Sequence, residues 1–154
     1  MSDSIFAIAR SGLDVEHQRM EVIAQNLANA GTTRTATGET YTPMRLVSGP
    51  RVASKFSDAL QFGAPGSTAS ALPTAGLTGV QAYAIEPAAT QPRLVYEPSH
   101  PHADAKGFVH YPGLDHAGEM ALMVQTQRVY EANVIMFNAA RSMYMRALDL
   151  GSKG

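Results

Sequence analysis

Four of the five histidines lie between His100 and His116, and they are the residues best suited to chemistry. The run HPHADAKGFVH contains His100, His102, Asp104 and His110. Imidazole nitrogens and carboxylate oxygens are zinc ligands, so one hypothesis is a small metal-dependent enzyme built on this cluster. The spacing matches no specific metal motif, however, and the prolines beside His100 are typical of an exposed turn. We favour the simpler interpretation, in which these polar side chains decorate a surface loop.

No other catalytic pattern occurs in the sequence. It has no HExxH motif, nucleophile elbow, P-loop or dinucleotide fingerprint. Its few carboxylates do not pair in the way that general acid–base catalysis requires. An aromatic column, Tyr130, Phe137 and Tyr144, recurs every seven residues, which indicates helix packing rather than a cofactor site. We therefore expect no catalytic residue, no cofactor and no metal, and the chain is predicted not to be an enzyme.

The composition restricts the partners. The formal net charge is -1 and the pI is about 6.5, whereas proteins that bind nucleic acid or anionic membranes are usually basic. The absence of cysteine excludes disulfides and thiolate zinc sites. No apolar run is long enough to span a bilayer, and the N-terminus lacks the basic start and apolar core of a cleaved signal peptide. We expect no nucleic-acid partner, no membrane insertion and no cleaved signal.

A long helix is predicted within the N-terminal segment, residues 1–31. Its apolar column recurs every seven residues and consists of Phe6, Leu13, Met20 and Leu27. This spacing is typical of an amphipathic helix with a narrow apolar seam. A second column of apolar residues is interrupted by Glu16. Gly31 is predicted to close the helix as its C′ residue.

A second long helix is predicted within the C-terminal segment, residues 115–154, with Asp115 as its N-cap. One large apolar column consists of Leu122, Val129, Met136, Met143 and Leu150. A second consists of Met123, Tyr130, Phe137 and Tyr144, and a small column of Thr126, Asn133, Ala140 and Ala147 lies between them. This face is wider than one ordinary partner helix covers. We infer that the terminal helices pair antiparallel and that the remaining face contacts other copies or other proteins.

The middle segment, residues 32–114, is predicted to be a small β-rich domain. The runs VQAYAIEP, RLVYEP and GFVHYP are β-branched or aromatic and end in proline, as strands bounded by turns do. YTPMRLV is a weaker candidate strand, and residues 62–76 are predicted to be a flexible loop. The predicted fold is α+β, with the two long terminal helices forming an antiparallel coiled coil and the β-rich domain inserted between them.

Both ends of the chain resemble a known family. RMEVIAQNLANAGTT is similar to the N-terminal signature of bacterial flagellar axial proteins, which form the rod and hook. LVYEP, the P-x-ADA-x-G-x-V run, GEM, YEANV and the closing ALDLG resemble the FlgC family of flagellar basal-body rod proteins. The resemblance implies a structural subunit of the proximal rod that is exported unfolded through the flagellar type III apparatus. It also implies that other rod proteins and copies of the chain itself are its partners.

In that interpretation the paired helices form the inner tube of the rod, and their apolar columns and asparagines form the assembly interface. The predicted interface residues are Phe6, Leu13, Met20, Asn26, Leu27, Asn29, Leu122, Val129, Tyr130, Asn133, Met136, Phe137, Met143, Tyr144 and Leu150. The asparagines, with Asn138, could fix the register between helices. Alternatively, Asn26 and Asn29 bond the last carbonyls of their own helix and Asn138 is solvated. A soluble adaptor with one exposed apolar groove is a third functional possibility, besides the rod subunit and the metal enzyme.

Overall fold

The computed structural model describes residues 2–52 and 77–151, so the predicted loop 62–76 lies outside the described residues. The elements follow the order α1 (Ser2–Ala28), β1 (Met44–Val52), β2 (Leu77–Pro87), β3 (Arg93–Tyr96), β4 (Phe108–Tyr111) and α3 (His116–Gly151). Along the chain, the small antiparallel sheets therefore lie between two terminal helices, which confirms the predicted α+β class. The four strands of the described residues overlap the four runs that the sequence indicated, although β1 extends to Val52 and β2 begins at Leu77, beyond those runs.

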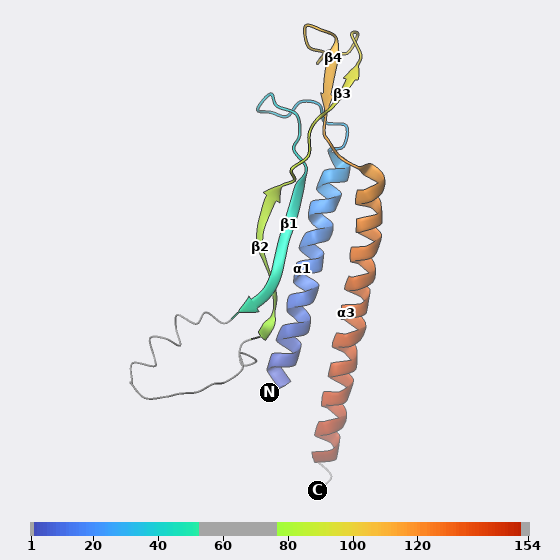
Figure 1. The fold of residues 1–154 in the computed structure, drawn as a ribbon. Helices are drawn as coiled ribbons and strands as arrows, with labels where there is room; N and C mark the ends of the chain where they lie inside the picture. The colour runs from blue at the N-terminus through green and yellow to red at the C-terminus, as the bar shows by residue number, and fades with distance from the viewer. Residues whose placement is uncertain (1, 53–76, 152–154) are drawn as a thin grey trace, which may run out of the picture.

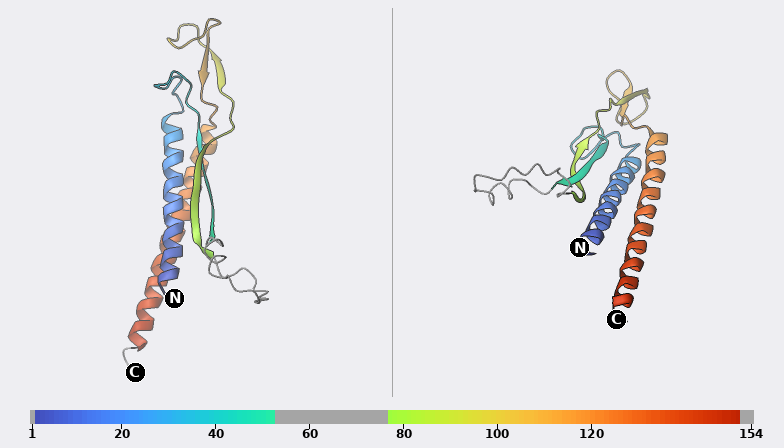
Figure 2. Two further views of the ribbon diagram at one scale, coloured as in Figure 1. Left: turned by 90° about the vertical axis from the view of Figure 1, so that its left-hand side faces the viewer. Right: turned by 60° about the horizontal axis from the view of Figure 1, so that its bottom comes forward.

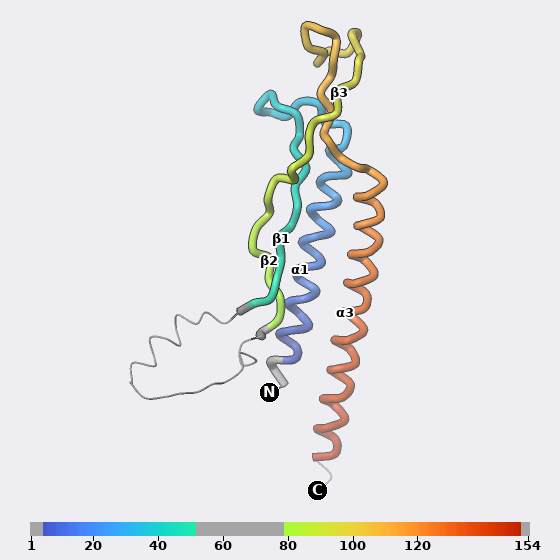
Figure 3. Tube along the Cα trace, in the orientation of Figure 1, coloured from blue at the N-terminus to red at the C-terminus, as the bar shows by residue number. Residues whose placement is uncertain are grey.

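The two helices lie side by side and run in opposite directions (Figures 1 and 2). The aromatic ring of Phe6 packs edge-on against the rings of Phe137 and Tyr144, at centroid distances of 5.4 and 6.0 Å. α3 has 36 residues and α1 has 27, and the trace in Figure 3 shows the C-terminal end of α3 continuing beyond the start of α1. The antiparallel direction of the helices is as predicted.

The start of α3 is as predicted, whereas the end of α1 is not. The Asp115 carbonyl accepts the Glu119 N–H at 2.9 Å, as expected of the N-cap of α3. The prediction for Gly31 is wrong, because the helix ends at Ala28 and Gly31 lacks the left-handed backbone of a C′ glycine. Asn29 closes the helix instead, since both its N–H and its Nδ2 donate to the Gln25 carbonyl, at 3.1 and 2.9 Å.

β1 and β2 form an antiparallel hairpin that lies along α1, on a different side from α3 (Figure 2). The register pairs Leu46 with Ile85 and Ser48 with Ala82, so Tyr83 forms a bulge between them. Leu46 packs with Val15 and Val22 of α1 in the hydrophobic core. The core of the subunit is therefore the contact between α1 and this hairpin.

β3 and β4 form a second, separate antiparallel hairpin, which lies beyond the ends of the helices (Figure 1). In the turn between its strands, the Asp104 carboxylate accepts the N–H groups of Lys106 and Phe108, each at 2.8 Å. The bond from Phe108 is the main reason that the pKa of Asp104 is lowered. The domain boundaries predicted at residues 31 and 115 stay predictions.

Neither helix, within the part of the chain that the structure describes, combines the length and the hydropathy needed to cross a membrane.

Candidate assembly surface

α1 has two partners, and the sequence indicated only one of them. The predicted seam, Phe6, Leu13, Met20 and Leu27, is half-buried, and Phe6 contacts α3. The most buried apolar side chains of α1 are Val15, Val22 and Ile23, and the first two pack on the β1–β2 hairpin. Ile8, Val15 and Val22 also recur every seven residues, so this further column, distinct from the one that Glu16 interrupts, was visible in the sequence and was missed.

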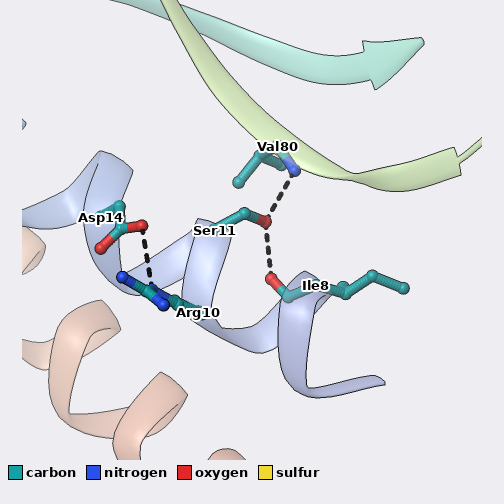
Figure 4. Close-up of polar contacts among 5 residues, drawn as sticks. All are labelled: Ile8, Arg10, Ser11, Asp14 and Val80. Atoms are coloured by element: carbon teal, nitrogen blue, oxygen red, sulfur yellow. Dashed lines mark hydrogen bonds and ion pairs between the residues drawn. The ribbon is translucent and has the colours of Figure 1, made fainter. Parts of the chain in front are cut away.

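Ser11 joins α1 directly to β2 (Figure 4). Its Oγ donates to the Ile8 carbonyl at 2.6 Å and accepts the Val80 N–H at 3.1 Å. This close approach requires glycine at the neighbouring position. Gly79 has φ +110°, and a Cβ there would lie 2.2 Å from the Ser11 Oγ. The contact fixes the position of β2 along the helix.

Asn26 joins α1 to the start of β1. Its side chain is 1% exposed, its Nδ2 donates to the Met44 carbonyl at 2.8 Å, and its Oδ1 accepts the Met44 N–H at 2.9 Å. The Tyr41 hydroxyl donates to the same Oδ1 at 3.0 Å, and a longer 3.4 Å bond reaches Glu119 of α3. Burial, followed by the nearby Glu119 carboxylate, raises the pKa of Tyr41. Neither sequence interpretation of Asn26 anticipated this bond to a strand.

The other predicted asparagines differ in role. Some fit the interpretation that they fix the register between helices, and others fit the local or solvated interpretation. Asn29 bonds the last turn of its own helix, as the local interpretation held. Asn133 of α3 lies against Gly12 of α1, where a Cβ would be 3.2 Å from the Asn133 Nδ2. Asn133 is therefore at the contact between the helices, where a register role would place it. Asn138 is exposed.

One large column of α3 faces α1. Tyr130, Phe137 and the small residue Asn133 are half-buried, Thr126 is buried, and Tyr144 contacts Phe6 from an exposed position. Burial decreases toward the C-terminal end of the helix, where α3 passes beyond α1.

The other large column of α3 is open to solvent. Its members, Leu122, Val129, Met136, Met143 and Leu150, are all exposed, from 38% at Leu122 to 78% at Leu150. A seven-residue column drifts by about 20° per heptad around a straight helix, so it turns steadily away from α1. Leaving large apolar side chains in water is unfavourable by about 1.5–3 kcal/mol each. Within the described residues, this exposed column is an apolar surface that burial against a partner would stabilise.

A groove with a volume of about 590 Å³ lies between α1, β1 and the first half of α3. Val22, Ile23, Leu122 and Val129 contribute apolar walls. Glu16, which interrupts an apolar column in the sequence, also lines it. The Glu16 Oε1 accepts a bond from Arg19 at 2.6 Å, and Arg19 donates to the Ser48 Oγ at 2.8 Å.

The histidine cluster forms no metal-binding arrangement in the described part of the chain, where no three His, Cys, Asp or Glu side chains converge. The His100 Nδ1 accepts the His102 N–H at 3.1 Å, and the His102 Nδ1 bonds the Thr33 hydroxyl at 2.8 Å. The first bond is local to the turn between β3 and β4, and the second joins that turn to the segment that follows α1. The geometry gives the metal-enzyme hypothesis no support.

Comparison with known proteins identifies the class from both ends of the chain. Residues 6–34 match the family described as flagella basal body rod protein, and residues 105–150 match the C-terminal family of the flagellar basal body rod FlgEFG proteins. These two segments contain most of α1 and nearly all of α3, which are the elements that carry the exposed and paired apolar columns. The chain thus has the two terminal segments of a flagellar rod protein.

Full-length relatives narrow the class further. The chain is 34% identical to the flagellar basal-body rod protein FlgC of Escherichia coli O6:H1, over 96% of each chain. It is 37% identical to the FlgC protein of Bacillus subtilis, over 94% of each chain, and 32% identical to that of Borreliella burgdorferi, over 93% of each. The chain belongs to the FlgC family of flagellar basal-body rod proteins. Its function is that of a structural subunit of the rod.

Proposed function

We propose that this rod subunit polymerises through its terminal helices into a helical tube, which forms part of the drive shaft and of the export channel. The observation that carries the proposal is the exposed column on α3, which runs from Leu122 to Leu150. Its five large side chains are apolar and remain exposed, even where Leu122 and Val129 line the groove beside α1. Full burial of a completely exposed side chain of this size contributes about 1.5–3 kcal/mol, and burial between subunits would recover a part of that in proportion to the exposed fraction of each.

The proposed assembly places α1 and α3 together in the wall of the tube as an antiparallel coiled coil, with α3 toward the central channel. The edge-on packing of Phe6 on Phe137 and Tyr144 supports this pairing. Side chains from neighbouring subunits would cover the exposed column of α3. The β-hairpins and the intervening segments would face outward.

The proposed location is the rod that spans the periplasm, and the proposed route is export without a cleaved signal through the flagellar type III apparatus. Other rod proteins and copies of this chain are the proposed neighbours. Helical tubes need heterologous contacts, in which two different surfaces of the subunit meet. On α3 the exposed apolar column is a different face from the one that packs on α1. It is therefore available for a contact with a different surface of a neighbouring subunit.

The test uses Met136→Lys, with Asn138→Lys as the matched control on the opposite side of α3. Both side chains are exposed, so neither substitution should disturb the isolated subunit. Met136→Lys should prevent incorporation into the rod and abolish motility, because a charge cannot be buried unpaired at the contact. Asn138→Lys should assemble and swim. Normal motility with Met136→Lys, or with Leu27→Asp in the predicted seam, would show that the helical surfaces do not drive assembly.

A further inference from the structure

The exposed column of α3 carries two side chains that can be oxidised. Met136 and Met143 are 67% and 66% exposed. They are seven residues apart, so they lie on the same side of the helix, about 10 Å from each other at 1.5 Å per residue. Val129 and Leu150 continue the column on either side of them. In the free subunit this pair of thioethers is therefore open to small solutes.

Three further methionines of the described residues, Met20, Met44 and Met123, are half-buried. Met44 packs against the hydrophobic core between α1 and the β1–β2 hairpin. Accessible side chains are oxidised first, so we expect these three methionines to react more slowly than Met136 and Met143. Oxidation of the exposed pair should therefore leave the core of the subunit intact.

Two methionines of α3 are exposed but lie outside the column. Met120 and Met145 are each 53% exposed. Met145 follows Met143 by two residues, which places it about 200° farther around the helix. Met120 precedes Leu122 by the same spacing. These two methionines are accessible to the same oxidants, but from the opposite side of α3.

Peroxides convert the thioether of methionine into a sulfoxide. The sulfur attacks the O–O bond, and this bond breaks as a new bond forms between sulfur and one oxygen. The sulfur gives up two electrons, and the other oxygen of hydrogen peroxide leaves as water. The product is polar and chiral, whereas methionine is apolar and flexible. A sulfoxide oxygen that is buried in an apolar contact lacks hydrogen-bond donors, which is unfavourable.

We propose that Met136 and Met143 form an oxidation-sensitive site, at which sulfoxide formation in the free subunit prevents its incorporation into the rod. The proposal rests on the proposed function, because only burial of this column between subunits makes the added oxygens unfavourable. In the free subunit both side chains are in water, where a sulfoxide is hydrated and does not disturb folding. After assembly, neighbouring subunits would shield the same sulfurs from oxidants.

The reactivity of the site is tested on the purified chain. Hydrogen peroxide is added, and mass spectrometry of peptides follows the sulfoxide at each methionine with time. Met136 and Met143 should be oxidised before the half-buried methionines, while the helical signal in circular dichroism stays unchanged. Equal or slower oxidation of the exposed pair would overturn the proposal, and so would loss of the helical signal as the pair reacts.

Two matched double variants test the effect on assembly. Met136→Leu with Met143→Leu removes the site, and Met120→Leu with Met145→Leu removes the exposed methionines outside it. Leucine has nearly the volume of methionine but no sulfur. Each chain would be expressed in cells that lack their own copy, with and without a dose of hydrogen peroxide that oxidises Met136 and Met143 in the unassembled wild-type chain. The amount of each chain in isolated basal bodies is compared with that in its own untreated culture.

Peroxide should reduce incorporation of the wild-type chain about tenfold, the effect of one buried polar group without a hydrogen-bond partner. The Met120→Leu, Met145→Leu variant should show the same loss. The Met136→Leu, Met143→Leu variant should lose much less, although the other rod proteins are oxidised equally in all three strains. Equal losses in the three strains, or no loss in any of them, would overturn the proposal.

A second measurement uses only the wild-type chain. After treatment with peroxide, sulfoxide at Met136 and Met143 should be about tenfold rarer in basal bodies than in the unassembled chain, for the same physical reason. Sulfoxide at these two positions that is equally frequent in both fractions would overturn the proposal. Absence of the untreated wild-type chain from basal bodies would instead contradict the proposed function.

Discussion

Asn26 of α1 holds Met44 of β1 by both of its backbone groups, with a 2.8 Å bond to the carbonyl and a 2.9 Å bond from the N–H. The side-chain amide thus pairs with β1 as a neighbouring strand would. It fixes the end of the helix to the start of the hairpin, and it is buried where the Glu119 carboxylate of α3 also approaches. One side chain therefore connects three elements of the subunit.

Asn26→Ala should lower the free energy of unfolding by about 2–3 kcal/mol, because both backbone groups of the partly buried Met44 would lose their hydrogen-bond partner. Asn29→Ala is the matched control one turn away, and its partly exposed side chain bonds only nearby groups, the Gln25 carbonyl and the Thr32 hydroxyl. We expect a loss of about 0.5 kcal/mol there. Chemical denaturation of the two purified variants measures the difference. Equal losses would mean that the bond to β1 contributes little.

Gly79→Ala should be strongly destabilising, because it combines a left-handed backbone with a Cβ that would collide with the Ser11 Oγ. We expect a loss of about 1–3 kcal/mol from the backbone strain alone. Gly31→Ala is the control, since no atom lies within 4 Å of its Cβ position and its φ is not positive. That variant should be neutral or slightly more stable. Thermal unfolding of both variants is sufficient, and a tolerated Gly79→Ala would contradict the close contact of α1 with β2.

The β3–β4 turn should lose stability in acid. Asp104 has a lowered pKa in the folded state, so its contribution is present above the pKa of the unfolded chain and is lost as the pH falls through the folded value. The amide shifts of Lys106 and Phe108, followed by NMR, should titrate with a midpoint below that of an ordinary aspartate. Asp104→Asn keeps an acceptor for both N–H groups and should remove the titration. A midpoint at or above the ordinary value would refute the assignment.

The isolated subunit should show a gradient of hydrogen exchange along α3. Amides near the buried Thr126 should be protected, and those between Met143 and Gly151 should exchange quickly, because that end has no neighbour in the single chain. Assembly should protect the same amides. Uniformly slow exchange to Gly151 in a dilute monomer would show that this end is stable without a partner.

The sequence predicted the elements better than it predicted their contacts. Seven-residue columns located both helices, and β-branched or aromatic runs ending in proline located the strands, since each signal is local. The bond from Asn26 to Met44 joins residues on different elements and requires the position of β1, which no periodicity supplies. The column Ile8, Val15 and Val22 could be found in the sequence, but the element that packs on it could not.

Glu16 illustrates the same limit at the candidate site. In the sequence it is a charge that interrupts an apolar column, whereas in the structure it is buried beside Arg19 and lines the groove.

The prediction that Gly31 is the C′ residue of α1 was wrong for a different reason. A glycine after a helix commonly adopts the left-handed C′ conformation, but the Asn29 side chain already bonds the last turn here.

Electron microscopy of the basal body, at a resolution that shows the side chains of this subunit, would test most directly whether the helical surfaces drive assembly. We predict that the α3 column from Leu122 to Leu150, which is exposed in the single chain, is buried against neighbouring rod subunits. A resolved rod in which this column faces solvent or the open channel, while other surfaces make the contacts, would contradict it.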